Sequence, residues 1–202
     1  MKLLLTSTVQ YFAPKLPEVL GEDLSSKNVL YIPTAAYAED GYEEWLVPEL
    51  NAIKPLVKNM SEFDIQGKSH EELVSALEGI DILYVTGGNT YVLLEAMNNI
   101  DFKKALLTFL ESGGVYLGSS AGSIVMCPDI NFIREMDEPK KARLETTKGL
   151  GLIDFAIMPH INQPKFNDIF VKTLEGSNKD KTIIGLRDDQ ALWVENNYIQ
   201  TC

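Results

Sequence analysis

The stretch VYLGSSAGSIVM, residues 115–126, decides the fold. Its first three residues are apolar and can form a buried strand. Five small residues, 118–122, follow, and an apolar segment resumes directly after them. This order predicts a buried strand that turns sharply into a helix. Two serines lie between the glycines of this turn, so the question is whether the turn exposes a serine hydroxyl for chemistry or only packs the strand against the helix.

The turn matches the pattern G-x-S-x-G, centred on Ser120. Small flanking residues permit a strained strand-to-helix turn that exposes the serine oxygen. The N–H of the next residue, Ala121, then lies at a helix N-terminus and can stabilise a developing oxyanion. We interpret Ser120 as a candidate nucleophile. The alternative is a packing turn in which the serine only caps the helix.

Outward from this turn, apolar strand-like runs alternate with segments of helical period. Other predicted strands are 2–6, 28–36, 59–65, 81–89 (ending in a glycine turn), 155–162, 181–189 and 191–200, the last with a hairpin at Asn196–Asn197. Helical patterns run from the first strand to about residue 25 and over 41–56, 69–80, 90–99, 101–114 and 165–176. A capping box is predicted at Ser69 and Glu72.

Apolar strands without alternation imply burial on both faces, and the helices between them supply the crossovers of a parallel sheet. We therefore predict an α/β fold: a doubly wound, mostly parallel sheet with helices on both faces. The 202 residues are expected to form one domain, 1–202. Ligands of such folds bind outside the carboxyl ends of the strands. The chemistry is therefore expected after Val85, Leu117, Met158 and Leu186.

A serine nucleophile needs a base, and the chain has two histidines, His70 and His160. His70 lies in the first turn of a charged helical segment and is predicted to be exposed. His160 closes the apolar strand that ends near Met158, so we expect it at the same edge as Ser120. A single histidine is otherwise more often a buried structural residue, but elimination favours His160 as the base.

A carboxylate that accepts a hydrogen bond from the imidazole fixes its tautomer and stabilises its protonated form. Asp188 and Asp189 follow a predicted strand and could supply this group, although two aspartates there could equally make a polar turn. Glu135, in the segment beyond the serine turn, competes with them. We favour Asp188, with Glu135 second.

The glycine pair Gly87–Gly88 follows another strand. Its backbone N–H groups could supply a second oxyanion donor beside Ala121. A glycine pair before a helix could also bind a phosphate. However, the segment lacks the lysine of a P-loop and the third glycine of a dinucleotide fingerprint.

Composition narrows the choice of partners. The formal net charge is −11, which argues against nucleic acid or an anionic membrane as partner. Cys127 and Cys202 lie far apart, so with two histidines they predict no zinc site, and no cofactor is expected. Cys127 is interpreted as a core residue. The two cysteines fit a reducing compartment, so we expect a cytoplasmic protein. The first residues, MKLLLTSTVQYF, are interrupted by polar side chains and do not predict a signal peptide.

The segments VTGGNTYVLLEAM, GGVYLGSSAGSIVMCPDI, MPHIN and TIIGLRDD together resemble the dipeptidase E and cyanophycinase family of serine peptidases over nearly the whole chain. The resemblance implies a fold similar to class I glutamine amidotransferases, a flavodoxin-like three-layer sandwich. It implies Ser120 as nucleophile, His160 as base, and Gly88 and Ala121 as oxyanion donors. The acid would be Asp188 or Glu135. A short peptide is the expected partner, and a homodimer is left open.

The chain departs from the aspartyl dipeptidases beyond His160. There the family supplies an arginine that reads the substrate's aspartate, but residues 161–186 contain none and offer Lys165 and Lys172 among their lysines. Aspartyl specificity is therefore not expected to transfer.

Two alternatives stay open at this point. An α/β-hydrolase-type esterase shares the serine turn but has the chain order Ser, acid, His. A non-enzymatic module could use both glycine turns to bind an anion or another small molecule.

Overall fold

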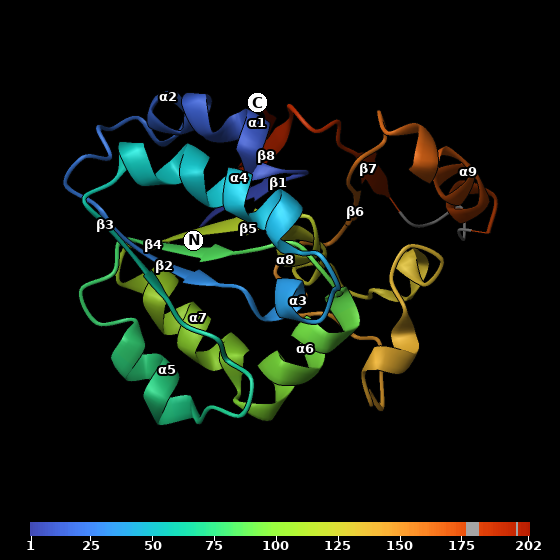
Figure 1. Cartoon of the computed structure of the whole chain (residues 1–202), viewed down its shortest axis with the longest axis horizontal. Helices are drawn as coiled ribbons and strands as arrows, with labels where there is room; N and C mark the ends of the chain where they lie inside the picture. Colours follow the sequence, from blue (N-terminus) through green and yellow to red (C-terminus); the bar gives the residue numbers. More distant parts are fainter. Residues whose placement is uncertain (177–181, 197) are drawn as a thin grey trace.

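The computed structural model describes residues 1–176, 182–196 and 198–202. Across these residues, seven strands form one sheet in the order β3-β2-β4-β5-β1-β8-β9 (Figure 1). The strands are β1 (Lys2–Thr6), β2 (Asn28–Ile32), β3 (Asn59–Glu62), β4 (Ile82–Val85), β5 (Val115–Ser119), β8 (Ala191–Glu195) and β9 (Tyr198–Thr201). The first five are parallel, and β8 and β9 are antiparallel to their neighbours. This arrangement confirms the predicted mostly parallel α/β fold.

Helices cover both faces of the sheet (Figure 1). One face carries α1 (Val9–Phe12), α2 (Leu16–Leu20) and α4 (Glu43–Ile53), and the other carries α5 (His70–Ala76), α6 (Thr90–Asn99) and α7 (Phe102–Glu111). Three more helices lie at or beyond the carboxyl ends of strands: α3 (Thr34–Tyr37), α8 (Ala121–Ile124) and α9 (Asn167–Gly176). The capping box predicted at Ser69 and Glu72 is present at the start of α5.

Two expected strands lie outside the main sheet. β6 (Ala156–Met158) and β7 (Ile183–Gly185) form a separate two-stranded parallel sheet. The expectation that they end at the edge of one common sheet is therefore wrong. β1 pairs with β5 on one side, and β8 occupies its other side over five paired residues. No side of β1 is therefore left for β6 or β7 to pair with.

Smaller differences concern element ends. Residues 34–37, predicted within or beside a strand, form α3, and the long first helical segment breaks into α1 and α2 around a short 3-10 turn. The hairpin predicted at Asn196–Asn197 joins two strands that do pair antiparallel. Its second residue, Asn197, lies outside the described residues.

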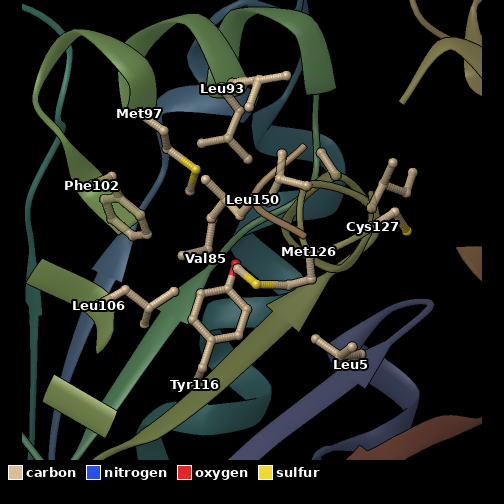
Figure 2. Close-up of a cluster of buried hydrophobic side chains, with 14 of the residues drawn as sticks. Leu5, Val85, Leu93, Met97, Phe102, Leu106, Tyr116, Met126, Cys127 and Leu150 are labelled. Carbon is tan, nitrogen blue, oxygen red and sulfur yellow. The ribbon is translucent and has the colours of Figure 1, made fainter. Parts of the chain in front are cut away.

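The core beneath the α6–α7 face is built from apolar side chains of the central strands and these helices (Figure 2). Leu5 of β1 and Val85 of β4 are fully buried there, and Cys127 is buried as predicted. Tyr116 of β5 is also fully buried, and its hydroxyl donates to the carbonyl of Gly122 at 2.7 Å. This bond ties the segment after the serine turn to the strand before it. No helix among the described residues is long and apolar enough to cross a membrane.

The close approach of α8 to β4 explains the second glycine of the pattern. A Cβ at Gly122 would lie 2.2 Å from the carbonyl oxygen of Val85. No real contact is that short, so a side chain there would push the helix away from the strand. Glycine is required here by space.

We expect Gly122→Ala to lower the free energy of unfolding by about 3 kcal/mol, the order of overpacking in a core. Alanine favours helices over glycine by about 1 kcal/mol, so propensity alone predicts the opposite sign. The measurement is urea denaturation. Gly151→Ala is the control, because Gly151 has φ of +61° but nothing within 4 Å of an added Cβ. If Gly122→Ala were as stable as Gly151→Ala, the packing argument would be wrong.

Candidate active site

Ser120 stands at the turn between β5 and α8 with φ 47° and ψ −107°. A positive φ is uncommon for a residue with a side chain, and such strain costs about 1–3 kcal/mol. Hydrogen bonds hold it on both sides: the N–H of Ser120 donates to the carbonyl of Thr6 at 3.1 Å, and its carbonyl accepts from the N–H groups of Ser123 and Ile124. The backbone of Ser120 is therefore held in this conformation at the carboxyl end of β5.

His160 follows β6 and faces the serine from the smaller sheet. Its Nε2 lies 3.1 Å from Ser120 Oγ. His160 also has a positive φ, 61°, and its backbone N–H donates to Ser7 Oγ at 2.8 Å. Phe166 stacks on the imidazole with ring centroids 5.5 Å apart. The ring is thus held by contacts on its backbone and on one face.

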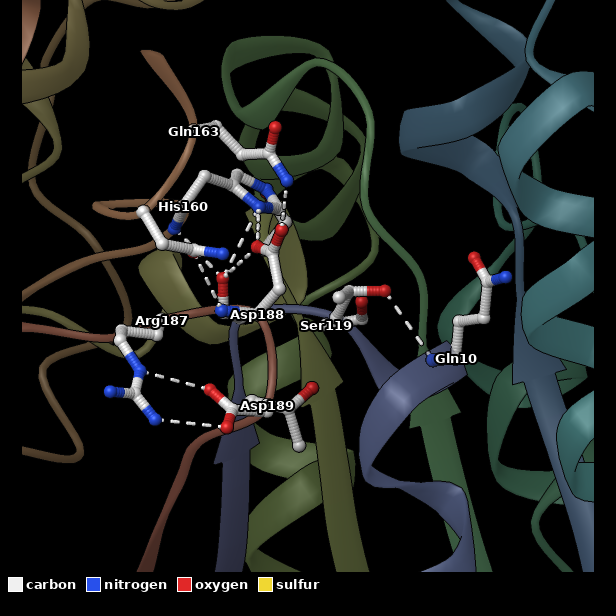
Figure 3. A network of polar contacts seen from close by, with 12 residues as sticks. Gln10, Ser119, His160, Gln163, Arg187, Asp188 and Asp189 are labelled. Atoms are coloured by element: carbon white, nitrogen blue, oxygen red, sulfur yellow. Dashed lines mark hydrogen bonds and ion pairs between the residues drawn. The ribbon is translucent and has the colours of Figure 1, made fainter. Parts of the chain in front are cut away.

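Asp188 follows β7 and contacts the other side of the same imidazole (Figure 3). Its Oδ1 lies 2.6 Å from His160 Nδ1 and accepts a hydrogen bond from Ser7 Oγ at 3.0 Å. Gln163 donates its amide to Oδ2, and the backbone N–H of Asp188 donates to Asn162 Oδ1 at 2.9 Å. Ser120, His160 and Asp188 are therefore connected in one chain of hydrogen bonds.

The surroundings of Asp188 favour its charged form. Burial raises the pKa of the Asp188 carboxyl, but hydrogen bonds from His160, Gln163 and Ser7 outweigh it and lower the pKa to about 2. A charged carboxylate accepts a hydrogen bond from the N–H of His160 Nδ1. A neutral imidazole in that tautomer presents the lone pair of Nε2 to the hydroxyl of Ser120.

The other predicted candidates lie elsewhere. Glu135 is exposed and lies 3.6 Å from Arg134, and within the described ranges it has no hydrogen bond to His160. Asp189 is exposed and forms an ion pair with Arg187 (Figure 3). His70 is half-buried rather than exposed, and its Nδ1 lies 3.0 Å from the carbonyl oxygen of Ile100.

The glycine pair lies beside the serine. A Cβ added to Gly87 would be 3.2 Å from the Cβ of Ser120, so this backbone borders the site directly. Gly88 has φ of +124° and packs against the carbonyl of Ala35, where a Cβ would clash at 2.1 Å. Ala121 is the first residue of α8, so its N–H has no acceptor within the helix. The roles of Gly88 and Ala121 as oxyanion donors stay predictions.

Sequence reasoning missed three polar residues of the network: Ser7, Asn162 and Gln163. Ser7 is fully buried, and it follows β1 at the carboxyl edge of the sheet. Ligands of such folds bind at the carboxyl ends of the strands, and the same rule applied to the end of β1 would have identified Ser7 as a candidate. Asn162 and Gln163 stand two and three residues after His160, but their contacts with Asp188 depend on the pairing of β6 with β7, which the sequence pattern does not fix.

Within the described parts of the chain, no group of three histidine, cysteine or acidic side chains is placed to bind a metal ion. What the geometry does offer is a hydroxyl hydrogen-bonded to an imidazole whose far nitrogen contacts a carboxylate. In this arrangement the imidazole can accept the serine proton, and the carboxylate stabilises the resulting positive charge.

The family model described as peptidase family S51 matches residues 3–202. The chain belongs to this family. It is 31% identical over 200 residues to an uncharacterized peptidase of Listeria innocua, covering 98% of this chain and 95% of the relative. It is 24% identical over 197 residues to peptidase E of a Nostoc strain, covering 94% of this chain and 77% of the relative. These matches confirm the resemblance to the dipeptidase E family and make the protein a peptidase.

Solved structures agree with the family. A crystal structure from Listeria monocytogenes, provisionally assigned to peptidase E, superposes with a TM-score of 0.91 at 30% identity and covers 100% of this chain and 97% of that one. A peptidase from an acI-B1 Actinobacterium shares the fold with a TM-score of 0.74 at 23% identity, covering 100% of this chain and 86% of that one. This S51 peptidase therefore has the fold of its relatives over its full described length.

The low pKa of Asp188 predicts a pH-dependent part of its stability. A carboxyl with a folded pKa of about 2 and an unfolded pKa of about 3.9 contributes stability above the unfolded value and loses it as the pH falls toward 2. The difference in free energy of unfolding between wild type and Asp188→Asn should thus be largest above about pH 5 and shrink toward pH 2. Urea denaturation across this range measures it. A difference that did not change with pH would contradict the assignment.

Proposed function

We propose that this S51 peptidase is a serine-type exopeptidase that hydrolyses short peptides, as a dipeptidase does, through an acyl-enzyme on Ser120. The observation that carries the proposal is the hydrogen-bonded chain from Ser120 Oγ to His160 Nε2 and from His160 Nδ1 to Asp188. The strained turn at Ser120 supports it, because such strain is concentrated at functional sites.

In the proposed first step, Ser120 Oγ attacks the carbonyl carbon of the scissile peptide while His160 Nε2 takes its proton. Asp188 stabilises the imidazolium. The carbonyl oxygen becomes negatively charged, and the N–H groups of Ala121 and Gly88 are the proposed donors to it. His160 then passes the proton to the leaving amine, the C–N bond breaks, and the acyl group stays on Ser120.

In the second step a water molecule attacks the acyl-enzyme. His160 takes a proton from the water and returns it to Ser120 Oγ as the ester bond breaks. The same base thus serves both half-reactions: Nε2 exchanges a proton with Ser120 Oγ in each of them, and also protonates the leaving amine in the first and deprotonates the water in the second.

The chain order separates this proposal from an α/β-hydrolase-type esterase. The carboxylate that contacts the histidine is Asp188, which follows His160 in the chain. The order is therefore Ser, His, Asp, whereas α/β-hydrolases have Ser, acid, His. The exopeptidase part of the proposal takes its support from relatives named peptidase E.

Substrate preference is proposed to differ from that of aspartyl dipeptidases, because residues 161–186 contain no arginine. We propose that neutral N-terminal residues are accepted at least as well as aspartate. One observation favours a competing reader of acidic substrates. Lys165 Nζ lies 4.7 Å from the ring centroid of Phe166, the residue that stacks on His160. A lysine there supplies a point charge without the paired hydrogen bonds of a guanidinium.

The proposal is tested with a fluorophosphonate probe and a peptide panel. Intact-protein mass spectrometry should show one adduct on the wild type, mapped to Ser120 by peptide sequencing, and none on Ser120→Ala. Hydrolysis should be found for dipeptides, including Asn-Leu beside Asp-Leu, and not for casein. An adduct on Ser119 or Ser123, or rapid internal cutting of casein, would overturn the proposal.

Two other carboxylates, Asp189 and Glu135, provide matched control variants for Asp188, the proposed acid. Asp188→Asn should lower kcat by about ten-thousand-fold, because an amide in that place favours the wrong imidazole tautomer. Asp189→Asn should stay within about twofold of wild type, because its partner Arg187 is also exposed and such pairs contribute little. Glu135→Gln should likewise retain activity. Steady-state kinetics on one dipeptide measure all three, and a large loss in Glu135→Gln with retention in Asp188→Asn would move the acid to Glu135.

A further inference from the structure

Glu49 of α4 is a buried carboxylate that the proposed reaction does not use. Only 4% of it is exposed. Its Oε1 accepts three hydrogen bonds, from Thr8 Oγ1 at 2.5 Å, the N–H of Val9 at 3.1 Å and Ser119 Oγ at 2.8 Å. Its Oε2 accepts from the hydroxyl of Tyr84. One carboxylate thus gathers donors from α1 and its N-cap, and from β4 and β5.

Two of these donors are chain neighbours of the site. Ser119 directly precedes Ser120, and Thr8 directly follows Ser7. Ser7 in turn accepts from the backbone of His160 and donates to Asp188. A single oxygen, Oε1 of Glu49, therefore connects the segment that carries the serine to the segment that holds the histidine and the aspartate.

A buried carboxylate is costly unless donors surround it, and an apolar side chain in its place would avoid that cost. The donors of Glu49 are themselves specific. Ser119 ends β5 and Thr8 is the N-cap of α1, and other residue types are compatible with both positions. In this chain both are hydroxyl residues, and both donate to Oε1 of Glu49. The cost is offset only with this complete set of partners, so the cluster defines one arrangement of the two segments.

We propose that Glu49 is a positioning residue that sets the separation between Ser120 and the His160–Asp188 pair; its kinetic consequence rests on the proposed function. The contact it controls is the 3.1 Å distance between Ser120 Oγ and His160 Nε2. Displacement of a reacting group by about 1 Å can cost about a hundredfold in rate. Glu49 touches neither substrate nor the reacting atoms, so its loss affects kcat and not KM.

The test compares variants that each remove one donor to the same carboxylate. Ser119→Ala and Thr8→Val each break one link between Glu49 and a site segment, and Thr8→Val also removes the N-cap acceptor of the Gln10 N–H. Tyr84→Phe removes a donor from β4 whose hydroxyl also contacts Ser119, but it leaves both of these links in place. We expect Ser119→Ala and Thr8→Val to lower kcat by about tenfold or more, with KM within about twofold of wild type. All three variants should lower the thermal stability, because each leaves the buried carboxylate with one donor fewer. Tyr84→Phe should nevertheless keep kcat within about threefold of wild type. Thr8→Ser, which keeps the hydroxyl, should restore kcat.

A second readout does not depend on activity. The chain has two histidines, so the ring resonances of His160 can be assigned in the NMR spectrum of a His70→Gln background. Ser119→Ala and Thr8→Val should shift the His160 ring signals and Tyr84→Phe should not. These spectra decide the positioning role even if the wild type neither hydrolyses peptides nor reacts with the fluorophosphonate, a result that would remove the proposed function alone.

Two outcomes would overturn the proposal. The first is equal loss of kcat in Ser119→Ala and Tyr84→Phe, in proportion to their thermal stability, which would make Glu49 a structural residue only. The second is a set of His160 ring signals that none of these variants changes.

Discussion

The backbone of Ser120 occupies a region that residues with side chains rarely adopt, and the geometry of the site depends on its being held there. The turn is held from three directions. Thr6 of the neighbouring strand accepts the N–H of Ser120, the first turn of α8 uses its carbonyl, and Tyr116 holds the carbonyl of Gly122. β5 is paired on both sides and buried along its length. The hydrogen bonds and packing of this central strand offset the free-energy cost of the strained backbone at Ser120.

His160 is a second strained residue, and it lies directly opposite the first. Its support comes from Ser7, which accepts its backbone N–H and also contacts the side chain of Asp188. Ser7 belongs to the end of β1, whereas His160 and Asp188 follow β6 and β7. The hydrogen bonds of one hydroxyl therefore join the large sheet to the small one at the point where the two strained backbones face each other.

The sequence pattern located the strands of the main sheet and singled out Ser120 and His160, and it favoured Asp188 without excluding Glu135. Long apolar strands next to glycine turns are strong local signals, and the scarcity of histidine left one plausible base. The separate small sheet could not be predicted, because a three-residue apolar run carries no information on which strand it pairs with. Glu49 and Ser7 were missed for a different reason. Glu49 lies between Pro48 and Leu50 in a helix that begins with two exposed acidic residues, and its burial depends on donors from distant segments.

The topology also explains why the carboxylate that contacts His160 follows β7 and not the serine turn. β4, β5 and β1 are adjacent and parallel, so Gly87, Ser120 and Ser7 emerge at one edge of the sheet. That edge offers small and hydroxyl groups but no imidazole. β6 and β7 are parallel to each other and pair in register at Met158 and Gly185, so the segments that follow them leave side by side and bring His160 against Asp188. The pairing of β6 with β7 places Asp188 next to His160. The segment around Glu135 takes no part in this pairing.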